Sequence, residues 1–192
     1  MIFETLAILS EEVDAYLGGD VIVIENVTSV DLTEGRGTLV ANKVILSLLN
    51  IQEESTMKNF PNVSVKGDRM LYKNPIVNLN LFLLFSANRS TYTQSLSDLS
   101  KVIEFFQGKK QFTQSNTIFK REVSPLNNVG NFKFSVELYT PTFEELNFIW
   151  GTLGGKQLPS ALYKVSVIEV EQGNIISESG AIAESTGATG RM

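Results

Sequence analysis

The sequence has 192 residues, a formal net charge of −5 and a pI near 4.9. This balance excludes most nucleic-acid binders, because phosphate contacts require a concentrated basic face. Neither histidine nor cysteine occurs, which excludes serine–histidine triads, histidine bases, thiolate metal sites and disulfides. The length predicts one large domain, or one domain plus an appendage, and the 43% hydrophobic content fits a globular protein.

The N-terminal segment has none of the features of an export signal. Residues 1–17 (MIFETLAILSEEVDAYL) lack a basic n-region and carry four acids. The most apolar run, residues 75–87, is interrupted by Asn78 and Asn80 and is shorter than the roughly 18 residues of a membrane span. We therefore expect cytoplasmic assembly and no membrane insertion, and the absence of cysteine fits a reducing compartment.

The first quarter of the chain predicts a helix and a short strand. The helix covers residues 2–17 and stops at Gly18–Gly19. Its apolar stripe consists of Ile2, Leu6, Leu9, Val13 and Tyr16. Residues 20–24 form a short β-branched run, and residues 33–37 have the composition of an exposed loop that makes contacts.

Two strongly apolar segments predict the centre of a sheet. Residues 43–53 (KVILSLLNIQE) and 76–86 are apolar on both parities, as expected of strands covered on both faces. Between them, residues 55–73 lose all periodicity and contain Pro61 and Gly67. We expect this segment to be a long excursion from the core, and such loops are usually functional or disordered.

The next elements are a helix and a half-buried strand. Residues 92–106 have helical spacing, with Gly108 as a C-cap, and should cover the sheet. The stripe comprises Tyr92, Leu96, Leu99, Val102, Ile103 and Phe106. A polar stretch follows with one edge-strand candidate at residues 118–123, and residues 132–139 then alternate as a half-buried strand does.

The last regular elements are a helix, a glycine break and a strand. Thr142 and Glu145 form a capping box, and Gly154–Gly155 ends the helix before a strand at residues 160–170. The inward stripe is Phe143, Leu146, Ile149 or Trp150, and Leu153. Trp150 is interpreted as a core residue rather than a binding aromatic. Both glycine pairs follow helices, so neither forms a phosphate-binding turn.

The remaining polar residues indicate neither an enzyme nor a cofactor site. The adjacent acids Glu11–Glu12, Glu53–Glu54 and Glu144–Glu145 point apart on regular elements and cannot act as a glycosidase pair. The basic doublets are too few for nucleic acid. Residues 172–192 have the composition of a disordered tail.

Ordering such a tail costs on the order of 20 to 40 kcal/mol of backbone entropy. It therefore needs a surface that holds it. We expect it to pack on a neighbouring subunit, adding a strand to a sheet edge.

Three segments occur in an order and spacing that resemble the cap proteins of extracellular contractile injection systems. They are residues 42–54 (NKVILSLLNIQEE), 75–88 (PIVNLNLFLLFSAN) and 142–165 (TFEELNFIWGTLGGKQLPSALYKV). The most specific part is Trp150-x-x-Leu153-Gly154 followed by Pro159-Ser160-x-x-Tyr163. The resemblance extends over about residues 3–171.

The resemblance implies a tail-terminator fold in a single α+β domain, residues 1–171, with a mixed, mainly antiparallel sheet of about four long strands and about three helices. It implies a structural cap, a homohexameric ring that closes the inner tube and sheath of a phage-tail-like particle at the end distal to the baseplate. The particle is either released or anchored in the cell. Some related caps carry a further C-terminal domain, and functions of that domain are not implied here.

Subunit-interface residues are expected in the excursions and the tail, with about 800 Å² buried per neighbour. They are Arg36, Arg69, Tyr72, Lys73, Ile175, Ile176 and Ile182. Two alternatives stay open. One is a tube–sheath connector of the same particle, and the other is a small-molecule binding domain with a pocket beneath residues 55–73.

Overall fold

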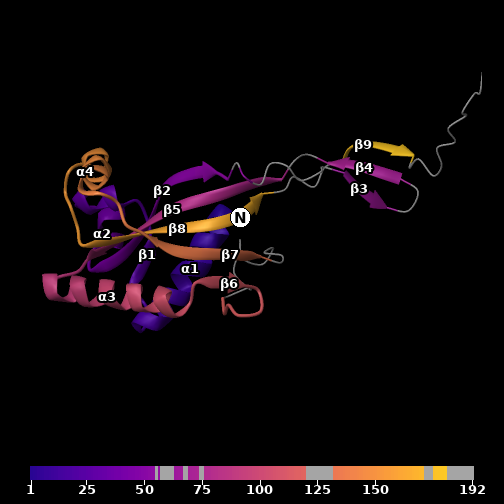
Figure 1. Cartoon of the computed structure of the whole chain (residues 1–192). Coiled ribbons are helices and arrows are strands. Elements are labelled where there is room, and N and C mark those ends of the chain that lie inside the picture. Colours follow the sequence, from indigo (N-terminus) through magenta and orange to yellow (C-terminus); the bar gives the residue numbers. More distant parts are fainter. Residues whose placement is uncertain are drawn as a thin grey trace, which may run out of the picture. The chain divides into compact units, whose positions relative to one another are not determined.

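The computed structural model describes residues 1–54, 56, 63–66, 69–73, 76–119, 132–170 and 175–180 (Figure 1). The chain divides into two compact units. The first combines Met1–Glu53 with Leu79–Ile168. The second combines the described residues of Glu54–Asn78 with those of Glu169–Met192.

A mixed six-stranded sheet forms the first unit, with the order β1-β2-β5-β8-β7-β6. The strands are β1 (Ile22–Ile24), β2 (Lys43–Glu53), β5 (Val77–Asn88), β6 (Gln111–Thr113), β7 (Lys133–Tyr139) and β8 (Ser160–Val170). β1 is parallel to β2, whereas the β2–β5, β7–β8 and β6–β7 pairs are antiparallel. The α+β class is confirmed, but the expected four strands are too few, because the short strands β1 and β6 extend the sheet at both edges.

Helices cover both faces of this sheet. They are α1 (Ile2–Leu17), α2 (Arg36–Val40), α3 (Tyr92–Gly108) and α4 (Phe143–Thr152), with a 3-10 helix η1 (Val27–Asp31). α1 and α3 pack on the face that carries Leu83 and Phe85. η1, α2 and α4 cover part of the other face around Ile45 and Leu84, with α2 and α4 at one end of the sheet (Figure 1). The segment around residue 36, predicted to be a loop, is therefore helical in part.

Local signals in the sequence fix where α1 and α4 begin and end. α1 stops at Gly18, whose φ of 107° is left-handed, and the Asp14 carboxylate accepts the backbone N–H groups of the residues that lead into β1. The predicted capping box of α4 is confirmed. The Thr142 hydroxyl accepts the Glu145 N–H at 3.2 Å, and Glu145 accepts the Thr142 N–H at 2.9 Å.

β2 is covered on both faces only in its first half. Its first residues are buried, as predicted, but Leu48 and Ile51 are exposed. β1 leaves β2 where Asn26 caps η1, its side chain accepting the Thr28 N–H at 3.1 Å. Within the described part of the chain, no strand replaces β1 along the rest of β2.

The second unit contains a three-stranded sheet. Its strands are β3 (Val63–Lys66), β4 (Arg69–Lys73) and β9 (Ile175–Gly180), in the order β3-β4-β9, and both pairings are antiparallel. The prediction of a loop at residues 55–73 is wrong where β3 and β4 form. Six residues of the predicted tail are a strand on β4 of the same chain, and contact of the tail with a neighbouring subunit stays a proposal.

The predicted edge strand at residues 118–123 is not found where it can be observed. Ile118 and Phe119 have no regular structure, and residues 120–123 lie outside the described part. The edge is formed instead by β6, where Phe112 lies opposite Phe134 of β7 and the two rings stack at 5.2 Å. Ring packing on the core therefore decided which short segment became the edge.

Candidate assembly surfaces

Glu12 and Tyr163, two residues with groups that could act in catalysis, are held in the folded structure. Glu12 pairs with Lys109 at 2.6 Å and also accepts the Ile118 N–H. Burial raises the pKa of the Tyr163 hydroxyl to about 12, so it stays protonated at neutral pH. In the described ranges no three possible metal ligands cluster, and no helix there could cross a membrane. The features of the described residues that indicate a function are exposed apolar surfaces.

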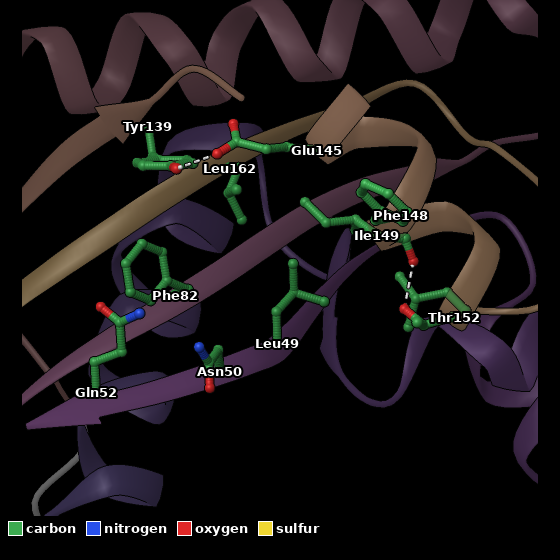
Figure 2. A pocket seen from close by; sticks show the side chains of 11 residues that line it. Leu49, Asn50, Gln52, Phe82, Tyr139, Glu145, Phe148, Ile149, Thr152 and Leu162 are labelled. Atoms are coloured by element: carbon green, nitrogen blue, oxygen red, sulfur yellow. Dashed lines mark hydrogen bonds between the residues drawn. The ribbon is translucent and has the colours of Figure 1, made fainter. Parts of the chain in front are cut away.

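A groove of about 390 Å³ runs between α4 and the sheet (Figure 2). Leu49, Phe82 and Leu162 lie on the strand side, and Phe148 and Ile149 lie on the helix side. The other lining residues are Asn50, Gln52, Tyr139, Glu145, Thr152 and Leu153. The floor is thus apolar, and amides, a hydroxyl and a carboxylate lie at its margins.

One hydrogen bond joins the two sides of this groove. The Tyr139 hydroxyl donates to the Glu145 carboxylate at 3.4 Å, linking β7 to the first turn of α4 (Figure 2). Since the same carboxylate closes the capping box, the start of α4 and the wall of the groove are fixed together. The groove is therefore part of the folded framework rather than a gap left by a loose helix.

Two phenylalanines of α4 are exposed, and one of them, Phe148, lines the groove. Phe148 is 64% exposed and Phe143 is 92% exposed. The prediction that Phe143 faces inward is wrong, whereas the core position of Trp150, 5% exposed, is confirmed. Phe143 lies on the same stripe as Trp150, but about 10 Å further along the helix axis, where the stripe extends beyond the core. Exposed aromatic side chains of this size are typical of contact surfaces.

α3 carries a second exposed apolar surface. Tyr92, Leu96 and Ile103 were predicted to face the sheet but are exposed, Tyr92 by 70%. The helix buries Ser95 instead, whose hydroxyl donates to the Ala87 carbonyl at 3.2 Å, together with Val102. This bond turns one edge of the apolar stripe away from the sheet.

Ile103 also lines a second hollow of about 240 Å³, with Leu138 of β7 and Leu146 of α4. The exposed side of α3 therefore continues into an apolar depression beside α4. Apolar side chains exposed in succession along one helix mark a surface that another protein covers.

The second unit brings together most of the predicted interface residues. Arg69, Tyr72 and Lys73 lie on β4, and Ile175 and Ile176 lie on β9 beside it. Lys73 is opposite Ile175, and Tyr72 is opposite Ser177. Segments separated by about one hundred residues thus pair in one sheet.

The other two predicted interface residues do not lie on β4 or β9. Arg36 belongs to α2 in the first unit, where its guanidinium lies 3.9 Å from Glu25 and is largely exposed. Ile182 lies outside the described residues. The two hollows lie beside α4, and the pocket that the small-molecule alternative expects beneath residues 55–73 stays a prediction.

The sequence contains signals for the three-stranded sheet and for the apolar side of α3, but none for the groove beside α4. The runs VSVK and RMLYK flank Gly67–Asp68, a typical hairpin signal that the proline and charges around it obscured. Of the predicted α3 stripe, Val102 and Phe106 are buried as expected, whereas Tyr92, Leu96 and Ile103 are exposed. The groove is formed by residues of β2, β5, β7, β8 and α4, and no local pattern indicates it.

Comparison with known proteins supports a single family. The sequence profile of the Pvc16 N-terminal domain matches residues 4–184. No curated protein sequence matches the chain. Two solved structures share its fold, and each is 14% identical in sequence.

The first is the PVC sheath/tube terminator of an extracellular contractile injection system in its extended state, with a TM-score of 0.67 over 100% of this chain and 64% of that one. The second is the anti-feeding prophage cap, described as a tube terminating cap, with a TM-score of 0.64 over 97% of this chain and 60% of that one. The chain therefore spans less than two thirds of either structure. Because the profile matches nearly the entire sequence, the chain belongs to the Pvc16 N-terminal domain family.

Proposed function

We propose that this chain is the structural cap, or tail terminator, of a contractile injection system. It forms a homohexameric ring that ends the inner tube and the sheath at the end distal to the baseplate. The observation that carries the proposal is the match of the whole fold to two tube terminators, together with family membership. At 14% sequence identity the two structures show that the fold is shared. The position of the chain in a particle is part of the proposal.

The surfaces of the first unit support a role in assembly. Apolar side chains exposed along α3 and at two positions of α4 would be costly in a protein that stays monomeric. A ring places two different surfaces of each copy in contact, because its interfaces are heterologous. The proposal assigns about 800 Å² per copy to each such contact, the usual size of a specific interface.

The tail contributes to the same assembly in this proposal. Part of it is already ordered as β9 on the chain's own β4. We propose that the tail, residues 172–192, packs on a neighbouring subunit, which would compensate the entropy lost on ordering it. Truncation after Glu171 should then weaken the ring, and an intact ring after truncation would refute this role.

The particle context follows from the same proposal. The chain assembles in the cytoplasm without inserting into a membrane and becomes part of a particle that is either released or anchored in the cell. The groove and hollows then serve protein contacts to the inner tube, the sheath or a neighbouring copy. No cofactor and no enzymatic reaction are assigned to the chain.

Imaging of particles from cells that lack the chain tests the function. Because a terminator stops the growth of a polymer, its loss should give particles with open distal ends and a broad distribution of tube lengths. Supplying the wild-type chain should restore one length, and a tagged chain should appear only at the distal end. Particles of normal length with a closed end in its absence would refute the proposal.

Two alternatives predict different results in related experiments. A tube–sheath connector would place the tag at another axial position. A small-molecule binding domain is favoured only by the groove beside α4, whose volume lies within the range of ligand pockets. It would show ligand-dependent melting of a monomer and no ring at any concentration.

A further inference from the structure

The three-stranded sheet of the second unit has two different outer edges. β4 is central, so β3 and β9 each pair on one side only, and the described residues provide no strand beyond either. Unpaired backbone groups along a sheet edge are satisfied by water or by another strand. The edges are similar in length, since β3 covers Val63–Lys66 and β9 covers Ile175–Gly180.

The register gives this sheet one predominantly apolar face. Val63 is opposite Tyr72 and Val65 is opposite Met70, and residues opposite each other in antiparallel strands share a face. Ser179, opposite Met70, continues this face on β9. Strands of four to six residues in a single layer are marginally stable alone, so further pairing or packing is expected.

The two outer strands each carry one charged residue, and the two charges are of opposite sign. β3 contains Lys66, and β9 contains Glu178. The segments around these strands have the same bias: residues 55–73 hold four basic residues and one acid, with two of the basic residues on the central strand β4, and residues 169–192 hold four acids and one basic residue. Contact between unlike edges is therefore favoured, whereas two β3 edges or two β9 edges repel.

We infer that the β3 edge of one copy pairs with the β9 edge of the next copy. Both strands are antiparallel to β4 and so run in the same direction. Rotation about a ring axis keeps that direction, so the strands that meet are parallel. A contact between unlike edges is heterologous and, repeated around an axis, gives a closed ring rather than a dimer.

The number of copies is taken from the proposed homohexameric cap, so the inference rests on that proposal. Six copies with three strands each would give a continuous sheet of 18 strands without a free edge. Closed barrels of 16 to 18 strands leave an open channel. The second units would thus form one wall around the axis, as the end of a tube requires.

Paired cysteines test this contact, because the natural chain has none. Three double variants cover three neighbouring parallel registers on the apolar face: Val65→Cys with Ser179→Cys, Val65→Cys with Ser177→Cys, and Val63→Cys with Ser179→Cys. Within one copy β4 separates β3 from β9 by about 10 Å, which is too far for a disulfide. Any disulfide between these positions therefore joins two copies.

The expected result is a ladder of covalent oligomers from at least one register after mild oxidation, which disappears on reduction. The matched control combines Ser64→Cys with Ser179→Cys, which the register places on opposite faces, and should remain monomeric under denaturing conditions. Rings by electron microscopy without a ladder from any pair would overturn the edge contact while the cap stands. A covalent dimer alone would also overturn it, and no ring at all would refute the cap and the edge contact together.

Charge exchange gives a second, independent test. Lys66→Glu should raise the dissociation constant between copies about two- to fivefold per contact, the size of a cross-strand charge effect. Lys66 lies opposite Arg69 in the hairpin, so this change adds no repulsion within the copy. Combining it with Glu178→Lys should restore the affinity. Equal affinities of the wild type and both variants would contradict the predicted edge polarity.

Discussion

The packing of Trp150 predicts a large difference in stability between two aromatic positions of one helix. Trp150 is 5% exposed and lies in a cluster with Val40, Ile45 and Leu84, whereas Phe148 is 64% exposed at the groove. Trp150→Ala removes a buried indole and leaves a cavity, so it should lower the free energy of unfolding by about 3 to 5 kcal/mol. Phe148→Ala should lower the free energy of unfolding by less than about 1 kcal/mol, because most of its side chain stays exposed to water in the folded state.

Urea unfolding followed by far-ultraviolet circular dichroism measures both changes, since the variant lacks the only tryptophan. For a chain of this size the loss corresponds to a melting temperature lower by roughly 6 to 20 °C. A conservative control, Trp150→Phe, should lose clearly less. If Trp150→Ala unfolds within about 1 kcal/mol of the wild type, or if Phe148→Ala costs as much, the division into core and contact positions is wrong.

Three further predictions concern α4, the start of the sheet and α3. Thr142→Ala should cost about 1 kcal/mol in urea unfolding, because it removes the acceptor of the Glu145 N–H; no loss would contradict the capping box. The hydrogen bond and charge of Lys43 lower the pKa of Asp20 in the folded state. The Asp20–Lys43 pair therefore stabilises the fold above the pKa of Asp20 in the unfolded chain, and this stabilisation is lost as pH falls through the folded pKa. Asp20→Asn should make the melting temperature depend less on pH between about pH 5 and pH 3, and an unchanged pH dependence would exclude a contribution of this pair. Leu96→Ser should weaken oligomer formation in light scattering with melting of the monomer unchanged, and unimpaired oligomers would exclude α3 from the interface.

Local signals in the sequence were sufficient to predict where some helices begin and end. Gly18 ends α1 because its positive φ is unfavourable for other residues, and Thr142 with Glu145 begins α4 by satisfying N–H groups that no helix can pair internally. The apolar runs at residues 43–53 and 76–86 also identified two adjacent strands, although β2 is covered on both faces only in its first half.

Patterns of apolar residues did not determine which side of a helix would be covered. On α3 the predicted stripe is divided: Val102 is buried together with Ser95, whose hydroxyl donates to the Ala87 carbonyl, whereas Tyr92 is exposed. On α4 the stripe continues to Phe143, but the core beneath it does not. Whether an apolar helix residue is buried depends on how far the neighbouring elements extend beneath it. The residues of the helix itself do not contain that information.

The resemblance in the sequence identified the family, and the fold and the family profile agree with it. It did not identify the second unit, because β4 and β9 are about one hundred residues apart and neither is strongly apolar. The sequence by itself determined the helix ends, the central strands and the lack of histidine and cysteine chemistry, since these depend on single residues and short periods. Only the tertiary structure decided the partner of the tail, the groove beside α4 and the two unlike edges, because each depends on backbone pairing or packing between distant segments.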